Sequence, residues 1–205
     1  SSKKEEKMLN KIIVYSKKYT LKHGFCNFEN LITNIFNTRN YSKFNDIKES
    51  LKTNDQFIWF DESNYLVLGG SEKRSTVINT LKKLLYINNK ISYEDFIEAL
   101  INNYRIGSAP PAQLLQKICK VHNLKFDEEY IYYSGEEINL GEGEKKIVKL
   151  FKENDEFLTF WECVNLSEKY DINIGSLGLY LYGHHLVKKL DNKVFCLYGT
   201  KIDNN

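Results

Sequence analysis

The sequence repeats one order of hydrophobic patterns three times, at intervals of about 65 residues. Each repeat opens with apolar residues at helical spacing, continues through a short apolar segment and two further helical patterns, and closes with two strand patterns around a polar turn. Three helices followed by a hairpin is the order of a winged helix-turn-helix module. We therefore predict an α+β fold, mainly α, with three tandem winged-helix modules over residues 1–70, 71–135 and 136–205.

The first module shows this pattern most completely. Asn27 precedes an apolar run and is predicted to cap the second helix, because a side-chain amide can accept a hydrogen bond from a free backbone N–H. The third helix carries an apolar stripe of Phe44, Ile47 and Leu51. The other predicted elements are helices at 8–22 and 28–37, a short strand at 25–26, and strands at 57–60 and 65–68 around a turn at 61–64.

The second and third modules repeat this order with different cap and turn residues. Pro110-Pro111 is predicted to open a helix, and Thr159 and Asn173 to cap two others. The second module is predicted to hold helices at 75–86 and 93–104 and strands at 90–91, 124–126 and 130–133. The third is predicted to hold helices at 144–154, 160–170 and 174–182 and strands at 157–158, 184–190 and 193–198.

Composition sets the class of protein. The 205 residues are 42% hydrophobic and 27% charged, which is typical of a folded chain, and no apolar run approaches the roughly 20 residues of a membrane span. The four cysteines are widely spaced without a Cys-x-x-Cys pair, so we expect buried free thiols in a reducing cytoplasm. Because the sequence does not begin with Met, we expect it to be a segment of a longer chain.

Three segments resemble known helix-turn-helix families. Asn54–Leu68 and His184–Gly199 resemble the closing segment of HARE-type helix-turn-helix domains, which occur in the RNA polymerase delta subunit, in restriction endonucleases and in chromatin proteins. Ile91–Tyr133 is similar to repeats of bacterial proteins that also carry sigma-factor-like helix-turn-helix regions. The resemblance implies a winged-helix fold and a DNA-related function in transcription regulation or genome defence. The same fold also serves as a protein-docking module.

The third helices of the first two modules are the candidate DNA-binding elements, because that helix enters the major groove in winged-helix proteins. Residues 1–70 and 71–135 carry net charges of +3 and +2, whereas residues 136–205 carry −3. The candidate contacts to phosphate or base edges are Arg39, Tyr41, Ser42, Lys43, Asn45, Lys48, Arg105, Ser108, Gln113, Gln116, Lys117 and Lys120.

Two observations favour the alternative that these residues form an ordinary solvated helix face. The predicted hairpin tips are acidic, with Asp61-Glu62 in the first module and Asp127-Glu128-Glu129 in the second, and they would repel phosphate. The first two modules are also only mildly basic for a tight DNA binder. The residue types on these helices still favour DNA as the partner, with a protein partner as the alternative.

The third module's third helix, residues 174–182, has almost no polar face. A helix that is apolar nearly all round is usually buried, so we expect it to dock against a neighbouring module, a second copy of the chain in a homodimer, or another protein. The predicted interface residues are Leu177, Leu179, Tyr180 and Tyr182.

No catalytic constellation, metal site or cofactor motif is predicted. His184 and His185 are adjacent on a predicted strand, where they would point to opposite faces and could not share a metal ion. We therefore expect a binding protein rather than an enzyme. The alternatives are a DNA-binding protein, a protein-interaction module such as an accessory subunit of a polymerase or defence complex, and the recognition domain of a nuclease whose cutting part lies elsewhere.

Overall fold

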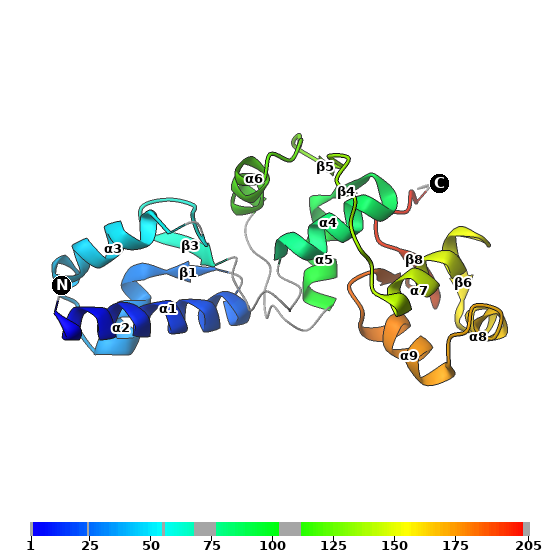
Figure 1. Ribbon diagram of the computed structural model, residues 1–205, viewed down its shortest axis with the longest axis horizontal. Helices are drawn as coiled ribbons and strands as arrows, with labels where there is room; N and C mark the ends of the chain where they lie inside the picture. The colour runs from blue at the N-terminus through cyan, green and yellow to red at the C-terminus, as the bar shows by residue number, and fades with distance from the viewer. Residues whose placement is uncertain (1, 24, 55, 68–76, 103–111, 203–205) are drawn as a thin grey trace. The chain divides into compact units, whose positions relative to one another are not determined.

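The computed structural model describes residues 2–23, 25–54, 56–67, 77–102 and 112–202. Their fold is α+β and mainly helical, with small antiparallel sheets (Figure 1). The chain divides into two compact units. The first unit comprises Ser1–Ile78 with Arg105–Asn123, and the second comprises Asn79–Tyr104 with Leu124–Asn205. The division into three modules stays a prediction.

The first unit contains one three-stranded sheet. Its central strand is the last one in sequence, so that the strand order is β1-β3-β2, with Cys26 opposite Tyr65 and Phe57 opposite Val67. The elements of this unit are α1 (Lys3–His23), β1 (Cys26–Asn27), α2 (Phe28–Phe36), the 3-10 helix η1 (Tyr41–Phe44), α3 (Asn45–Lys52), β2 (Phe57–Trp59), β3 (Asn64–Val67) and α6 (Ala112–Val121).

The second unit contains a two-stranded sheet, β4-β5, and a three-stranded sheet, β6-β8-β7, in which the last strand is again central. Its elements are α4 (Val77–Asn88, whose first two residues are counted with the first unit), β4 (Lys90–Ser92), α5 (Tyr93–Asn102), β5 (Tyr130–Tyr132), α7 (Glu142–Lys152), β6 (Leu158–Thr159), α8 (Phe160–Ser167), α9 (Ile174–Gly183), β7 (Val187–Lys189) and β8 (Val194–Leu197).

The three predicted helix caps are confirmed. The side chains of Asn27, Thr159 and Asn173 each accept a hydrogen bond from the backbone N–H three residues further on, at 3.0, 3.3 and 2.8 Å. Pro110 and Pro111, which were predicted to open a helix, lie outside the described residues. Local capping signals therefore fix where α2, α8 and α9 begin.

Several element boundaries differ from the predicted ones. Helix α1 begins at Lys3 rather than Met8. The negative charges of Glu5 and Glu6 in its first turn stabilise this start, because they interact with the positive end of the helix dipole. The strand predicted at 124–126 is reduced to a single bridge between Phe126 and Ile131. The helix predicted to reach Tyr170 ends at Ser167.

A buried polar network joins α1 to the central strand of the first unit. The hydroxyls of Ser16 and Tyr65 lie 2.6 Å apart, and the Cys26 thiol donates to the Ser16 carbonyl at 3.1 Å. The Thr20 hydroxyl accepts from the backbone N–H of Val67 at 3.2 Å. These contacts satisfy polar groups in an otherwise apolar core and fix the register of β3 against α1.

All four cysteines are free and buried, as predicted. Burial raises the pKa of Cys26 and Cys196 to about 11, and that of Cys119 and Cys163 to about 12. Cys119, Cys163 and Cys196 therefore pack as small apolar side chains, whereas Cys26 also donates a hydrogen bond to the Ser16 carbonyl.

Replacing Tyr65 by Phe should lower the free energy of unfolding by about 1–3 kcal/mol, because the buried Ser16 hydroxyl loses its partner. The double change Ser16→Ala with Tyr65→Phe should cost less than the sum of the single changes, since it removes both partners together. Urea denaturation of the four proteins measures this coupling. Strictly additive costs would show that the two hydroxyls do not interact.

Candidate functional site

The segment between α2 and α3 brings together most of the candidate residues of the first module. Arg39, Ser42, Lys43 and Asn45 are all exposed there. Tyr41 is half-buried, and its hydroxyl lies 2.7 Å from the Thr33 hydroxyl of α2, which anchors the segment. The structure thus presents two cations and two small polar side chains on one short, anchored stretch.

Lys48, unlike these exposed residues, is held by contacts within the first unit. Its ammonium lies 3.2 Å from the Glu29 carboxylate and 5.5 Å above the Phe28 ring, and its side chain is only 15% exposed. This ion pair ties α3 to α2. A phosphate contact by Lys48 would have to break it.

The candidate residues on α6 also divide into those held by contacts within the unit and those exposed to a partner. The Lys117 ammonium donates hydrogen bonds to the backbone carbonyls of Trp59 and, at 3.0 Å, Phe60, so that it holds α6 against the end of β2. Gln116 is half-buried, whereas Gln113 and Lys120 are exposed. Arg105 and Ser108 lie outside the described residues.

The acidic turns, which the sequence suggested would repel phosphate, have a structural role. In both turns an aspartate, Asp61 or Asp127, accepts hydrogen bonds from the backbone N–H groups two and three residues further on, at 2.8 and 2.7 Å. The pKa of Asp61 is lowered mainly by the Asn64 side chain, and that of Asp127 by the Tyr132 hydroxyl. Such Asx turns are a recognisable sequence signal, and both carboxylates remain negative.

In the second unit a cluster of charged groups surrounds Glu144 at the start of α7. One carboxylate oxygen accepts from the Gly141 N–H at 2.9 Å, and the other lies 3.0 Å from the Lys83 ammonium. The latter oxygen is also 3.6 and 3.5 Å from Nε2 of His184 and His185. Burial alone would raise the pKa of Glu144, but the hydrogen bonds from His185 and Gly141 and the charge of Lys83 outweigh it and lower the pKa.

The prediction that His184 and His185 lie on a strand and point to opposite faces is wrong. Helix α9 ends at Gly183 and β7 begins only at Val187, so both histidines lie in the intervening turn. Alternation between faces requires extended backbone at successive residues; His184 is extended, but the chain turns at His185 and Leu186. The two rings instead stack, with centroids 4.1 Å apart and planes 28° apart, and both face Glu144.

Glu144, His184 and His185 offer donor atoms of the kind that zinc prefers, all within 4.8 Å of one another. Two features favour an ionic cluster over a shared metal. The Lys83 ammonium already occupies the carboxylate oxygen that both rings face. A metal must also lie in the plane of each ligating ring, and two stacked, nearly parallel rings do not direct their lone pairs at one point. The prediction that no metal binds here stays a prediction.

The predicted interface residues of α9 fall into two groups. Leu177 is fully buried inside the unit, and Tyr180 is half-buried with its ring 4.7 Å from that of His184, so neither is fully available to a partner. Leu179 and Tyr182 are 76% and 49% exposed. Helix α9 therefore buries one apolar face inside the unit and exposes another.

An exposed tryptophan on α8, missed from the sequence, extends this surface. Trp161 is 70% exposed, and the Phe160 ring contacts both Trp161 and Tyr182, at centroid distances of 5.3 and 6.1 Å. Trp161, Leu179 and Tyr182 together form the α8–α9 patch. The capping box at Thr159 fixes where α8 begins but not which of its faces packs on the core, so it does not reveal that Trp161 is exposed.

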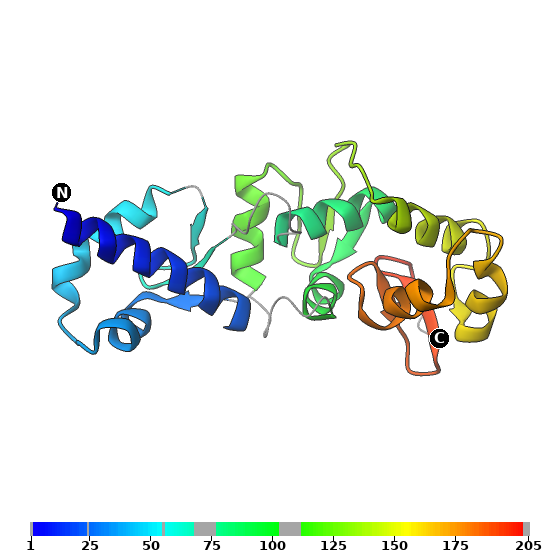
Figure 2. The same ribbon diagram turned by 60° about the horizontal axis from the view of Figure 1, so that its bottom comes forward.

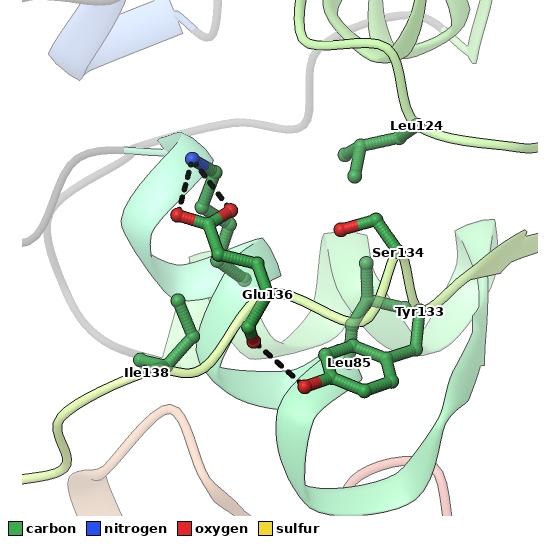
Figure 3. A pocket seen from close by; sticks show the side chains of 7 residues that line it. Leu85, Leu124, Tyr133, Ser134, Glu136 and Ile138 are labelled. Carbon is green, nitrogen blue, oxygen red and sulfur yellow. Dashed lines mark hydrogen bonds and ion pairs between the residues drawn. The ribbon is translucent and has the colours of Figure 1, made fainter.

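One small pocket lies in the second unit, shown in Figure 3. The space between its side chains, about 170 Å³ with open solvent included, is smaller than a typical ligand-binding pocket. Its polar groups contact one another, because Lys82 pairs with Glu136 at 3.0 Å and the Tyr133 hydroxyl donates to the Glu136 carbonyl at 2.7 Å (Figure 3). This pocket therefore offers little to a ligand.

Comparison of the chain with protein-family models, with curated proteins and with solved structures found no match. The resemblance to HARE-type domains stays a prediction. Among the helices of the described ranges, none is both long and apolar enough to cross a membrane.

Replacing Glu144 by Gln should lower the free energy of unfolding at neutral pH, because Lys83 and His185 lose their anionic partner. The folded-state pKa of Glu144 is lowered, so its stabilising contribution is present above the unfolded pKa of about 4.5 and is lost as the pH falls through the folded pKa. The difference between the two proteins should therefore narrow below about pH 4.5.

Urea denaturation at pH 7, 4 and 3 measures this difference. Glu142→Gln, on the same turn but fully solvated, is the matched control and should change stability little. A Glu144→Gln penalty that stays constant with pH would contradict the proposed ion cluster.

Proposed function

We propose that the chain binds DNA through its first unit, at the segment between α2 and α3, in transcription regulation or genome defence. The proposal assigns two parts of the chain as winged helices. The order helix, strand, helix, helix and hairpin, with the last strand central in the sheet, supports that assignment for residues 3–67 and 142–197.

The observation that carries the proposal is the exposure of Arg39 and Lys43 on the segment that leads into α3. Among the residues that the structure describes, no carboxylate forms an ion pair with either cation. In a winged helix this segment and the start of the following helix face the major groove. Arg39 and Lys43 suit phosphate oxygens, and Ser42 and Asn45 suit phosphates or base edges.

The site is narrower than the one expected from sequence. Lys48 and Lys117 are removed from it by their contacts with Glu29 and with the carbonyls of Trp59 and Phe60. The remaining cations are few, which fits modest affinity and a shallow dependence on salt, since the slope of log K against log salt scales with the number of phosphates neutralised.

Replacing Arg39 and Lys43 together by Ala should weaken binding to duplex DNA about tenfold or more and lower the slope of log K against log salt by about two. Fluorescence anisotropy over a salt series measures both quantities. Lys149→Ala, an exposed lysine of the second unit, is the control and should leave the slope unchanged. Lys48→Ala should reduce stability rather than the slope. An unaltered slope in the Arg39/Lys43 variant would rule out this segment.

A second candidate function is protein binding through the α8–α9 patch. Exposed aromatic and aliphatic side chains gathered on one surface are typical of protein interfaces, where tryptophan and tyrosine supply most of the binding energy. The net charge of −3 over residues 136–205 makes this part of the chain less suited to phosphate. The occupant that we propose to test first is a second copy of the chain.

Replacing Trp161 and Leu179 by Ser should raise the dissociation constant of a homodimer at least tenfold, because both side chains would leave the interface core. Sedimentation of the full chain over a concentration series measures this constant. Val14→Ser removes one exposed aliphatic side chain from α1 and serves as the control. A wild-type chain that remains monomeric throughout the series would exclude the homodimer.

A further inference from the structure

Helix α1 concentrates positive charge on its solvent face. At 100° per residue, all of its lysines fall within about 80° of Lys7, opposite the buried side chains of Ile12, Ser16 and Thr20. We call this surface the α1 lysine face. It consists of Lys3, Lys4, Lys7, Lys11, Lys17, Lys18 and Lys22.

The charge of this face is not neutralised by ion pairs among the residues that the structure describes. Residues 3–23 carry a net charge of +5, whereas the whole chain carries +2. No described carboxylate lies within ion-pair distance of these lysines, while other lysines in the described residues pair with Glu29, Glu62 and Glu136. Like charges one helical turn apart destabilise a helix, so binding of a polyanion would relieve a repulsion that the free chain carries.

The α1 lysine face also adjoins the segment between α2 and α3. The Lys11 ammonium lies 5.6 Å above the Phe36 ring, and the Phe36 ring stacks on that of Phe44 at 5.1 Å. Phe44 follows Lys43 directly in the chain. Packed aromatic rings thus connect the two positively charged surfaces without an intervening carboxylate in these contacts.

The dimensions of the face suit a duplex. Helix α1 is unbroken over its 21 residues, as Figure 2 shows, so its lysines from Lys4 to Lys22 extend over about 27 Å. That length corresponds to about eight base pairs of duplex at 3.4 Å per base pair. An anionic membrane fits less well, because the apolar side of α1, with Ile12 fully buried, packs into the core and cannot insert between lipids.

We propose that the α1 lysine face binds the phosphate backbone of double-stranded nucleic acid, alongside the segment between α2 and α3. This inference rests on the DNA-binding function proposed above and extends it from the α2–α3 segment to a much longer phosphate contact. The α1 lysine face supplies charge without base readout, so its contribution is the same for all sequences and depends strongly on salt.

The test uses the full chain and a 12-base-pair duplex, with fluorescence anisotropy over a salt series. The variant Lys7→Gln, Lys11→Gln, Lys18→Gln, Lys22→Gln should bind at least 30-fold more weakly near 0.1 M salt, with the slope of log K against log salt lowered by about three to four. Glutamine has nearly the helix propensity of lysine, so α1 should stay folded. The matched control replaces the same number of exposed lysines of the second unit, Lys125, Lys149, Lys169 and Lys193, by Gln.

The outcomes separate this inference from the proposed function. An unchanged slope in the α1 variant, with binding lost in the Arg39/Lys43 variant, overturns the inference and leaves the proposed function standing. A lowered slope in the α1 variant, with binding unchanged in the Arg39/Lys43 variant, supports the α1 lysine face and overturns the α2–α3 segment. Absence of duplex binding by the wild type, or tighter binding to vesicles of anionic lipid than to duplex, overturns both. If circular dichroism shows that the fourfold variant is unfolded, Lys7→Gln with Lys11→Gln should still lower the slope by about two.

Discussion

The central position of the last strand holds each three-stranded sheet together, because β3 and β8 pair with neighbours along both edges. A sheet of such short strands gains little from its own hydrogen bonds and depends on packing against helices. In the first unit Tyr65 supplies that packing from the middle of β3, since its ring lies 4.6 Å from that of Trp59 and its hydroxyl reaches Ser16 on α1. The segment between α2 and α3 is presented by a scaffold whose order depends on this strand.

Contacts between elements decide which cations remain available for a partner. Lys48 forms an ion pair with a carboxylate and Lys117 donates to backbone carbonyls, whereas Arg39 and Lys43 are exposed. In the second unit Lys188 is likewise held by an ion pair, because it lies 2.7 Å from Asp95 and joins β7 to α5. Counting lysines therefore overstates the charge that phosphate would meet, except on α1, whose lysines all lie on the side away from the core.

Much of the fold could be predicted from short-range signals in the sequence. The caps at Asn27, Thr159 and Asn173 depend on contacts three residues apart and could be predicted from the sequence. The clustering of His184 and His185 around Glu144 could not, because it joins residues 40 positions apart through a turn that periodicity does not reveal. Likewise, the pairing of Lys117 with the hairpin links distant segments, and the exposure of Trp161 depends on which side of α8 faces the core.

The buried thiols give the two units a property that neither binding surface shares. With pKa values of about 11 to 12, the cysteines hold only about one thiolate in ten thousand or fewer at neutral pH, and the folded core excludes reagents and oxidants from them. Cys26 and Cys119 belong to the first unit, and Cys163 and Cys196 to the second. The reaction rate of each pair therefore reports how often its own unit opens, so that local opening of one unit can be distinguished from global unfolding of the chain.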